Sequence, residues 1–200
     1  MNTSVDMSSE FNESRDNAES LGLRIRYRRK KRVWTLDQLA EASGVSRAGI
    51  SRIERGETVP STTTLSRIAE ALGLNFSELM SVHSNEQEDV VLLKPCQQPM
   101  FIDENGFERR CIAPVLPSKG LDWVHNKLPA GETSGELFAH ATAVEEYLYV
   151  LDGKLEVRLG ETVHELKAGD SLYYRAQVPR QFTTIGKRVC QYMMIINAPR

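Results

Sequence analysis

The chain has 200 residues, of which 40% are hydrophobic, and its formal net charge is −2 at pH 7. This length suffices for one ordinary domain or two small ones, and neither the composition nor the net charge singles out a partner. No apolar run approaches the length that crosses a bilayer, and the opening stretch MNTSVDMSSEFNESRDNAES lacks the basic start and apolar run of a signal peptide. We therefore expect a cytoplasmic protein without a membrane partner.

The cysteines Cys96, Cys111 and Cys190 are widely spaced and form no C-x-x-C pair. This spacing indicates neither a disulfide framework nor a zinc ribbon. We expect buried free thiols, with a redox sensor as the alternative.

Charge is distributed unevenly along the chain. Residues 1–19 are rich in Ser and Asn and carry five acids against one base, which predicts a disordered tail. Residues 20–80 are net basic, and acids again exceed bases from Ser81 onward. A basic segment between two acidic ones indicates a polyanion as the partner of the middle segment only.

Residues 20–80 carry the signals of five short helices. The signals are, in chain order, Leu21, Leu23 and Ile25 at the first helix, a Thr35-x-x-Gln38 capping box and Gly44 at the second, Ser46 and Gly56 at the third, Pro60-Ser61 at the fourth, and Asn75-x-x-Glu78 at the fifth. Five short helices with a tight turn between the second and third are the pattern of a helix-turn-helix domain.

The stretch TLDQLAEASGVSRAGISRIERGETVPSTTTLSRIAEALG resembles the DNA-binding domains of the lambda-repressor-like, xenobiotic-response-element family. The resemblance rests on the turn Ala40-x-x-x-Gly44, the helix S-R-x-x-I-S-R-I-E-R-G and the following Pro60. It implies a homodimer that binds a two-fold double-stranded DNA operator, with the third helix in the major groove. It also implies a structural pairing of Arg29 with Glu54 rather than a DNA contact for Arg29.

The third helix supplies the predicted DNA contacts. Because Ile50 and Ile53 face inward, helical periodicity exposes the opposite face. The residues that we expect to contact DNA are Ser46, Arg47, Ala48, Ser51, Arg52 and Arg55. Arginine can bind guanine O6 and N7 with two hydrogen bonds, so Arg47 and Arg52 are the predicted base readers, while Ser46 donates to a phosphate.

Two positions of this segment leave alternatives open. Gly49 is a poor helix former, and its missing side chain either allows closer approach to DNA or is a tolerated weak spot. Leu36 stands where many members of the family carry a phosphate-binding Gln, so that contact does not carry over.

Beyond residues 81–89, which are polar and acidic and predict a linker, the hydrophobic period changes to two. KLEVRLGETVHELKAGDSLYYRA alternates apolar with polar residues, and Asp152-Gly153 predicts a short hairpin between YLYVL and KLEVRL. Residues 90–200 therefore form an all-β domain, for which a closed jelly roll best avoids open strand edges. The fold class is α+β in two domains.

PAGETSGELFAHATAVEEYLYVLDG and AGDSLYYRAQVPRQF resemble the two motifs of the cupin family, which supply three histidines and one glutamate to a metal. The resemblance aligns Glu146 with the family carboxylate and His140 with its first histidine. Thr142 and Arg180 stand where the other two histidines belong. Threonine is a feeble ligand and arginine is permanently cationic, so we expect no metal, no cofactor and no catalytic residue.

The same positions predict a binding pocket in the barrel. If Glu146 points inward, strand alternation brings Leu148 and Val150 with it, and in the same way His140 brings Phe138 and Glu136, and Arg180 brings Phe182. The predicted effector contacts are Phe138, His140, Thr142, Glu146 and Arg180. The alternative is that Glu146 and Arg180 satisfy each other as a buried ion pair in a filled barrel.

The combined layout predicts a bacterial transcriptional regulator. We expect its cupin domain to sense a small charged metabolite, amino acid-like or an amine, and to modulate operator binding. One alternative is a metalloenzyme, because hydroxypropylphosphonate epoxidase is similar in layout, but the histidines that hold its iron align with Thr142 and Arg180. Another alternative is constitutive repression with a ligand-free structural barrel.

Overall fold

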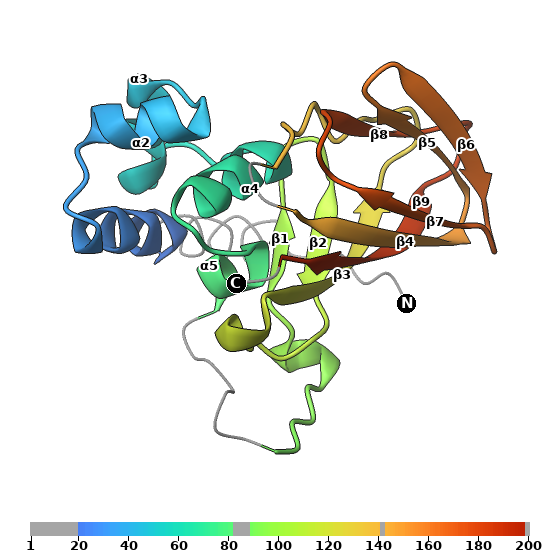
Figure 1. Cartoon of the computed structure of the whole chain (residues 1–200), viewed down its shortest axis with the longest axis horizontal. Helices are drawn as coiled ribbons and strands as arrows, with labels where there is room; N and C mark the ends of the chain where they lie inside the picture. The colour runs from blue at the N-terminus through green and yellow to red at the C-terminus, as the bar shows by residue number, and fades with distance from the viewer. Residues whose placement is uncertain (1–19, 82–88, 141–142, 199–200) are drawn as a thin grey trace, which may run out of the picture. The chain divides into compact units, whose positions relative to one another are not determined.

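The computed structural model describes residues 20–81, 89–140 and 143–198 (Figure 1). The predicted tail at 1–19 and nearly all of the predicted linker at 81–89 lie outside the described residues. The chain divides into two compact units, Met1–Pro60 and Ser61–Arg200. The predicted fold class is confirmed, because a helical N-terminal region is followed by a domain of antiparallel sheets.

The first unit is helical. Its described elements are a helix at residues 20–31, α2 (Leu36–Ser43) and α3 (Arg47–Glu54). The predicted capping box at Thr35 and Gln38 is present, and Gly44 ends α2 in the left-handed conformation with φ 65°. The buried apolar side chains of this unit are Leu21, Ile25, Leu39, Ile50 and Ile53.

A buried ion pair stabilises this unit. The guanidinium of Arg29 donates from Nε to Glu54 Oε1 at 2.6 Å and from Nη2 to Glu54 Oε2 at 2.7 Å. Its Nη1 donates to the carbonyl of Trp34 at 2.8 Å. The planar guanidinium of Arg29 and the planar carboxylate of Glu54 thus form a bidentate ion pair, which is stronger than a pair with a single hydrogen bond. The structural pairing that the family resemblance implied is therefore confirmed.

The second unit begins with two helices, α4 (Thr62–Ala71) and α5 (Phe76–Met80), which start at the predicted caps Ser61 and Asn75. The boundary between the two compact units lies between Pro60 and Ser61, before these helices, although the helix signals in the sequence continue through Met80. The reason is a set of polar contacts with the β-domain. The backbone N–H and hydroxyl of Thr62 each donate to Asp103 Oδ2 at 3.0 Å, and the N–H of Ser77 donates to Asp122 Oδ2 at 3.2 Å.

The rest of the second unit consists of two antiparallel sheets. One has the order β1-β2-β3-β9-β4-β7 and the other the order β6-β5-β8. The strands are β1 (Met100–Ile102), β2 (Glu108–Cys111), β3 (Leu121–Leu128), β4 (Glu145–Asp152), β5 (Lys154–Leu159), β6 (Thr162–Lys167), β7 (Ser171–Arg175), β8 (Arg180–Thr184) and β9 (Cys190–Asn197). Inward side chains of both sheets share one core, including Val124, Leu148, Leu155, Val157 and Phe182. In Figure 1, α4 and α5 lie beside the end of the six-stranded sheet that includes β1 and β2.

The hairpin predicted at Asp152-Gly153 is wrong. β4 pairs with β7 and β9, whereas β5 pairs with β6 and β8, so this turn carries the chain from one sheet to the other. Gly153 has φ 84°, and a Cβ there would meet Val189 O at 2.8 Å and Cys190 Cα at 2.9 Å. The glycine is required by crowding as well as by its backbone angle.

The prediction of buried thiols holds for two of the cysteines only. Cys111 and Cys190 are buried, and burial raises the pKa of Cys111 to about 12 and that of Cys190 to about 11. Both thiols therefore stay protonated and unreactive at neutral pH. Cys96 is exposed, contrary to the prediction, because it lies in a short 3-10 turn at Pro95–Gln97 with no buried residue. Within the described ranges, no helix is long and apolar enough to span a bilayer.

Candidate functional site

The outer face of α3 carries the side chains that the sequence predicted for DNA. Ser46, Arg47, Ala48, Arg52 and Arg55 are exposed, and Ser51 is half-buried. The guanidinium of Arg47 lies 3.2 Å from Asp37 of α2, in a pair whose side chains are both largely exposed. An exposed pair of this kind contributes little stability and separates readily. Arg47 is therefore available to another acceptor.

Arg55 is already engaged in the free protein. Its Nε and Nη2 donate to the two oxygens of Glu57 at 2.5 and 2.8 Å, and its Nη1 donates to Ser51 Oγ at 2.5 Å. These contacts hold the guanidinium along the helix surface. Ser51 and Arg55 would have to exchange them to reach a base, whereas Arg52 contributes an exposed guanidinium from the same face.

Gly49 has a local role that neither sequence alternative included. Ser46 caps α3, and its Oγ accepts a hydrogen bond from the Gly49 N–H at 3.1 Å. A Cβ on residue 49 would lie 3.0 Å from that oxygen. The missing side chain therefore leaves room for the cap, and the Ser46 hydroxyl keeps its own proton as a hydrogen-bond donor.

A buried ion pair occupies the cupin-motif positions of the β-domain. Arg180 Nη2 lies 2.8 Å from Glu146 Oε1, and Arg180 Nε donates to Glu146 Oε2 at 3.2 Å. The Tyr174 hydroxyl also donates to Glu146, which is fully buried. Burial opposes ionisation of Glu146, but the Arg180 charge and the hydrogen bond from Tyr174 hold the pKa of this carboxyl below its usual value.

Strand parity predicts only part of this region correctly. Leu148, Val150 and Phe182 are buried beside Glu146 and Arg180, as expected. Glu136 and Phe138 are exposed instead, because this segment joins β8 only through isolated bridges and Leu137 is its inward residue. Thr142 lies outside the described residues.

The residues at the cupin-motif positions do not fit a metal. The two potential ligands, Glu146 and His140, both face the guanidinium of Arg180, whose Nη2 lies 2.6 Å from His140 Nε2. A cation would meet a permanent positive charge at that point. Across the stretches that the structure describes, no group of three or more His, Cys, Asp or Glu side chains could hold a metal ion.

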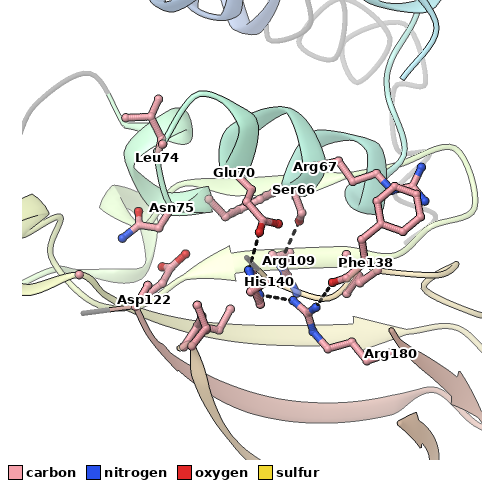
Figure 2. Close-up of a pocket in the computed structure, with 17 residues that line it drawn as sticks. Ser66, Arg67, Glu70, Leu74, Asn75, Arg109, Asp122, Phe138, His140 and Arg180 are labelled. Atoms are coloured by element: carbon pink, nitrogen blue, oxygen red, sulfur yellow. Dashed lines mark hydrogen bonds and ion pairs between the residues drawn. The ribbon is translucent and has the colours of Figure 1, made fainter. Parts of the chain in front are cut away.

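A cavity of about 330 Å³ lies between the helices α4 and α5 and the neighbouring end of the barrel. Figure 2 shows Ser66, Arg67 and Glu70 of α4 on one side and Arg109, His140 and Arg180 on the other. Of the predicted effector contacts, Phe138, His140 and Arg180 line the cavity, whereas Glu146 lies behind Arg180 and does not. The sequence did not predict that α4 lines the cavity, since polar residues such as Glu70 are typical of a helix face that contacts solvent.

A chain of polar and charged side chains connects α4 with the barrel interior. His140 Nδ1 lies 2.7 Å from Glu70 Oε1, and its Nε2 faces Arg180, which in turn pairs with Glu146. Because a guanidinium only donates, Nε2 is the acceptor and Nδ1 carries the proton that is donated to Glu70. The dashed lines of Figure 2 trace the contacts from Glu70 to Arg180.

The two parts of the chain match two families. The helix-turn-helix family matches residues 25–79, and the cupin domain family matches residues 124–196. The chain belongs to the helix-turn-helix transcriptional regulators that carry a C-terminal cupin domain, as the sequence motifs predicted.

Individual proteins of this class are similar over nearly the whole chain. The HTH-type transcriptional regulator SutR of Escherichia coli (strain K12) is 29% identical over 183 residues, which are 92% of this chain and 97% of SutR. The HTH-type transcriptional regulator PuuR of the same organism is 24% identical, over 85% of this chain and 90% of PuuR. A crystal structure of an HTH_3 family transcriptional regulator from Vibrio cholerae has a TM-score of 0.75 at 26% identity and covers 94% of this chain and 99% of its own. The protein is therefore a transcriptional regulator of the class with a helix-turn-helix region and a cupin domain.

Proposed function

We propose that this regulator binds a specific DNA operator through α3 and that a small charged metabolite alters its affinity for the operator. The observation that carries the proposal is the cavity, which is lined by α4 and α5 on one side and by the barrel on the other. The stretch matched by the helix-turn-helix family includes α4 and all of α5 except its last residue. A ligand in this cavity would therefore contact the sensor and the last helices of the DNA-binding family domain at once.

The coupling follows from connectivity. The chain passes from α3 through Pro60 into α4 with only a few residues between the two helices. A ligand that changes the spacing of α4 from the barrel would change how α3 is presented to DNA. Such a ligand must bind one state more tightly than the other, and couplings of about 1–3 kcal/mol are typical. Glu70, His140 and Arg180 are the proposed contacts that report on the ligand.

The test has two stages. A metabolite panel is first screened for compounds that raise the melting temperature of the full-length protein. Operator binding is then measured with and without each hit, on an operator selected from a random duplex library. We expect at least one hit to change operator affinity about fivefold or more. If compounds bind but none changes operator affinity, the barrel is not a sensor and repression is constitutive.

DNA readout by α3 is tested separately. We expect the double substitution Arg47→Ala and Arg52→Ala to lower the ratio of specific to nonspecific DNA affinity, because each two-point contact with guanine is worth about 1–3 kcal/mol of discrimination. Arg158→Ala, an exposed arginine on β5, is the matched control. An unchanged ratio in the double variant would contradict the assignment of these two base readers.

The proposal includes a homodimer and a cytoplasmic location, both of which suit a two-fold operator. A candidate dimer surface is the outer face of the six-stranded sheet, where Trp123, Ile195, Tyr147 and Tyr173 occupy one row across four neighbouring strands. Tyr147 and Tyr173 are 46% and 49% exposed, and their rings lie 4.9 Å apart. An apolar row of this kind, with three exposed aromatic side chains, is typical of an interface with another copy.

A further inference from the structure

The cavity beside α4 contains a buried cation without a counter-ion. Arg109 of β2 is only 3% exposed. Its Nε donates to Asn126 Oδ1 at 2.9 Å and its Nη1 to Ser66 Oγ at 3.2 Å, and both acceptors are neutral. Its guanidinium also lies 5.1 Å from the ring centre of Phe76. Within the described stretches, no carboxylate lies within ion-pair distance of Arg109, unlike Arg180 with its partner Glu146.

Asp122 lines the same cavity but forms no ion pair with Arg109. Both oxygens of Asp122 accept hydrogen bonds from Ser77, one from the backbone N–H and one from the hydroxyl. Burial raises the pKa of Asp122 despite these bonds and the Arg109 charge. A buried guanidinium that lacks an ion pair is costly, so Arg109 is a cavity cation that an anionic ligand could pair with.

A second arginine adds to this charge. Arg67 of α4 lies 3.7 Å above the ring centre of Phe138, and its Nη2 donates to the carbonyl of Glu136 at 3.3 Å. Its Nε is buried and has no hydrogen-bond partner in the part of the chain that is described. Arg67 likewise forms no ion pair there. The stacking fixes the plane of the guanidinium beside the cavity, which is the arrangement that suits a planar anion.

The remaining wall determines what the anion must carry. Leu74, Leu137, Val144 and Ile196 line the cavity together with the two arginines. An inorganic ion would leave this apolar surface unfilled. We propose that the cavity binds a small organic acid in its anionic form, with Arg109 and Arg67 on the acid group and the apolar wall on its carbon skeleton. This inference rests on the proposed sensor function and narrows the metabolite to an anion, which disfavours a simple amine.

The experiment uses probes that share an apolar body and differ in charge. Phenylacetate, phenylmethanesulfonate, phenylacetamide and phenethylammonium form one set, and hexanoate and hexanamide form a second. Binding to the full-length protein is measured by calorimetry and by melting temperature. We expect at least one anion to bind about tenfold or more tightly than its amide, with the carboxylate and sulfonate arms identifying the preferred acid group. The ammonium probe should not bind.

Three variants connect the binding with the two arginines. Arg67→Met removes a half-exposed side chain and should keep the fold, while Arg109→Gln removes the buried charge and retains a hydrogen-bonding group for Asn126. Each should weaken the anion about tenfold or more. Arg188→Met, a largely exposed arginine of another surface, is the control and should leave anion binding unchanged. The melting temperature of each unliganded variant reports folding, and Arg67→Met decides the question if Arg109→Gln does not fold.

The proposal is overturned if no anion binds more tightly than its amide, if the ammonium probe is preferred, or if Arg67→Met binds the anion as the unaltered protein does. Operator binding distinguishes this failure from that of the sensor function. An anion that binds through the arginines but leaves operator affinity unchanged supports the site and contradicts the sensor. A metabolite that regulates DNA binding without these arginines supports the sensor and overturns the anion site.

Discussion

Glu146 is a fully buried carboxylate that three side chains contact. Arg180, His140 and Tyr174 all contact it, and none of them lies on β4 itself. A carboxylate held in this way contributes stability only while it is ionised. The sign follows from its pKa, which is lowered in the folded state. The contribution is therefore fully present above the ordinary value of 4.5 and is lost as the pH falls through the folded value.

The substitution Glu146→Gln tests this. It leaves Arg180 as a buried charge without its anion, so we expect a loss of about 3–5 kcal/mol in the free energy of unfolding at pH 7. Below pH 4.5 the difference from the unaltered protein should shrink, because protonation removes the same charge from the native residue. Urea denaturation at a series of pH values measures both effects.

Glu145→Gln on the same strand is the control for that experiment. Glu145 faces the other side of the sheet and accepts a hydrogen bond from the Tyr173 hydroxyl at 3.0 Å. A surface change of this kind costs about 0.5 kcal/mol or less. A pH-independent loss in Glu146→Gln, or an equal loss in both variants, would show that the buried charge is not the source of the stability.

At the scale of elements, the turn at Gly153 determines how the chain leaves one sheet for the other. We expect Gly153→Ala to cost about 2–4 kcal/mol of stability, because the new Cβ adds overlap with the backbone at Val189 and Cys190 to the strain of a positive φ. Gly169→Ala is the matched control, since Gly169 has φ 93° and nothing lies within 4 Å of its added Cβ. Thermal unfolding of both variants isolates the steric part. Equal losses would contradict the crowding at Gly153.

A second prediction concerns the attachment of α4. Asp103 accepts hydrogen bonds from the N–H and hydroxyl of Thr62 and from the N–H groups of Asn105 and Phe107. Asp103→Ala leaves these buried donors without an acceptor. We therefore expect the free energy of unfolding to fall by about 2–4 kcal/mol and hydrogen exchange in the first turn of α4 to become faster. Glu104→Ala, at the exposed neighbouring position, should change neither. Unchanged exchange in α4 after Asp103→Ala would show that the helix does not depend on this acceptor.

Local signals predicted the elements well. The caps at Thr35, Ser46, Ser61 and Asn75 all start helices, because each side chain satisfies an N–H of its own first turn. The short β1–β2 hairpin was missed, although Asn105-Gly106 is a turn signal between its strands. The Asp152-Gly153 hairpin was wrong because a tight turn has the same sequence whether the next strand pairs with the last one or crosses to another sheet.

The candidate site was only partly predictable for a related reason. Motif alignment brought His140 and Arg180 together correctly, because both follow from their places in the cupin pattern. It could not find Arg67, Glu70 or Arg109, whose roles depend on how α4 packs against β2 and its neighbours. Such long-range contacts leave no period in the sequence. The unpaired state of Arg109 is a property of its surroundings and not of its own segment.

At the scale of the whole molecule, the apolar row across β3, β9, β4 and β7, formed by Trp123, Ile195, Tyr147 and Tyr173, predicts self-association. We expect the double substitution Tyr147→Glu and Tyr173→Glu to weaken self-association at least about tenfold, because it introduces charges at the centre of an apolar interface. Sedimentation equilibrium measures the dissociation constant. Val163→Glu, at an exposed apolar position of the other sheet, should leave it unchanged. An unaltered dimer in the double variant would assign the interface to another surface.

The division of the chain at Pro60 has a consequence for recombination. The family matches suggest that domains of two relatives could be joined at residues 81–89, because one match has ended there and the other has not begun. A hybrid joined there would combine α4 and α5 of this chain with the β-domain of a relative. Thr62 and Ser77 would then be separated from their hydrogen-bond acceptors Asp103 and Asp122. A sensor exchanged between relatives would carry its two helices with it, so the unit that can be inherited or engineered intact begins at Ser61 and not at the apparent family boundary.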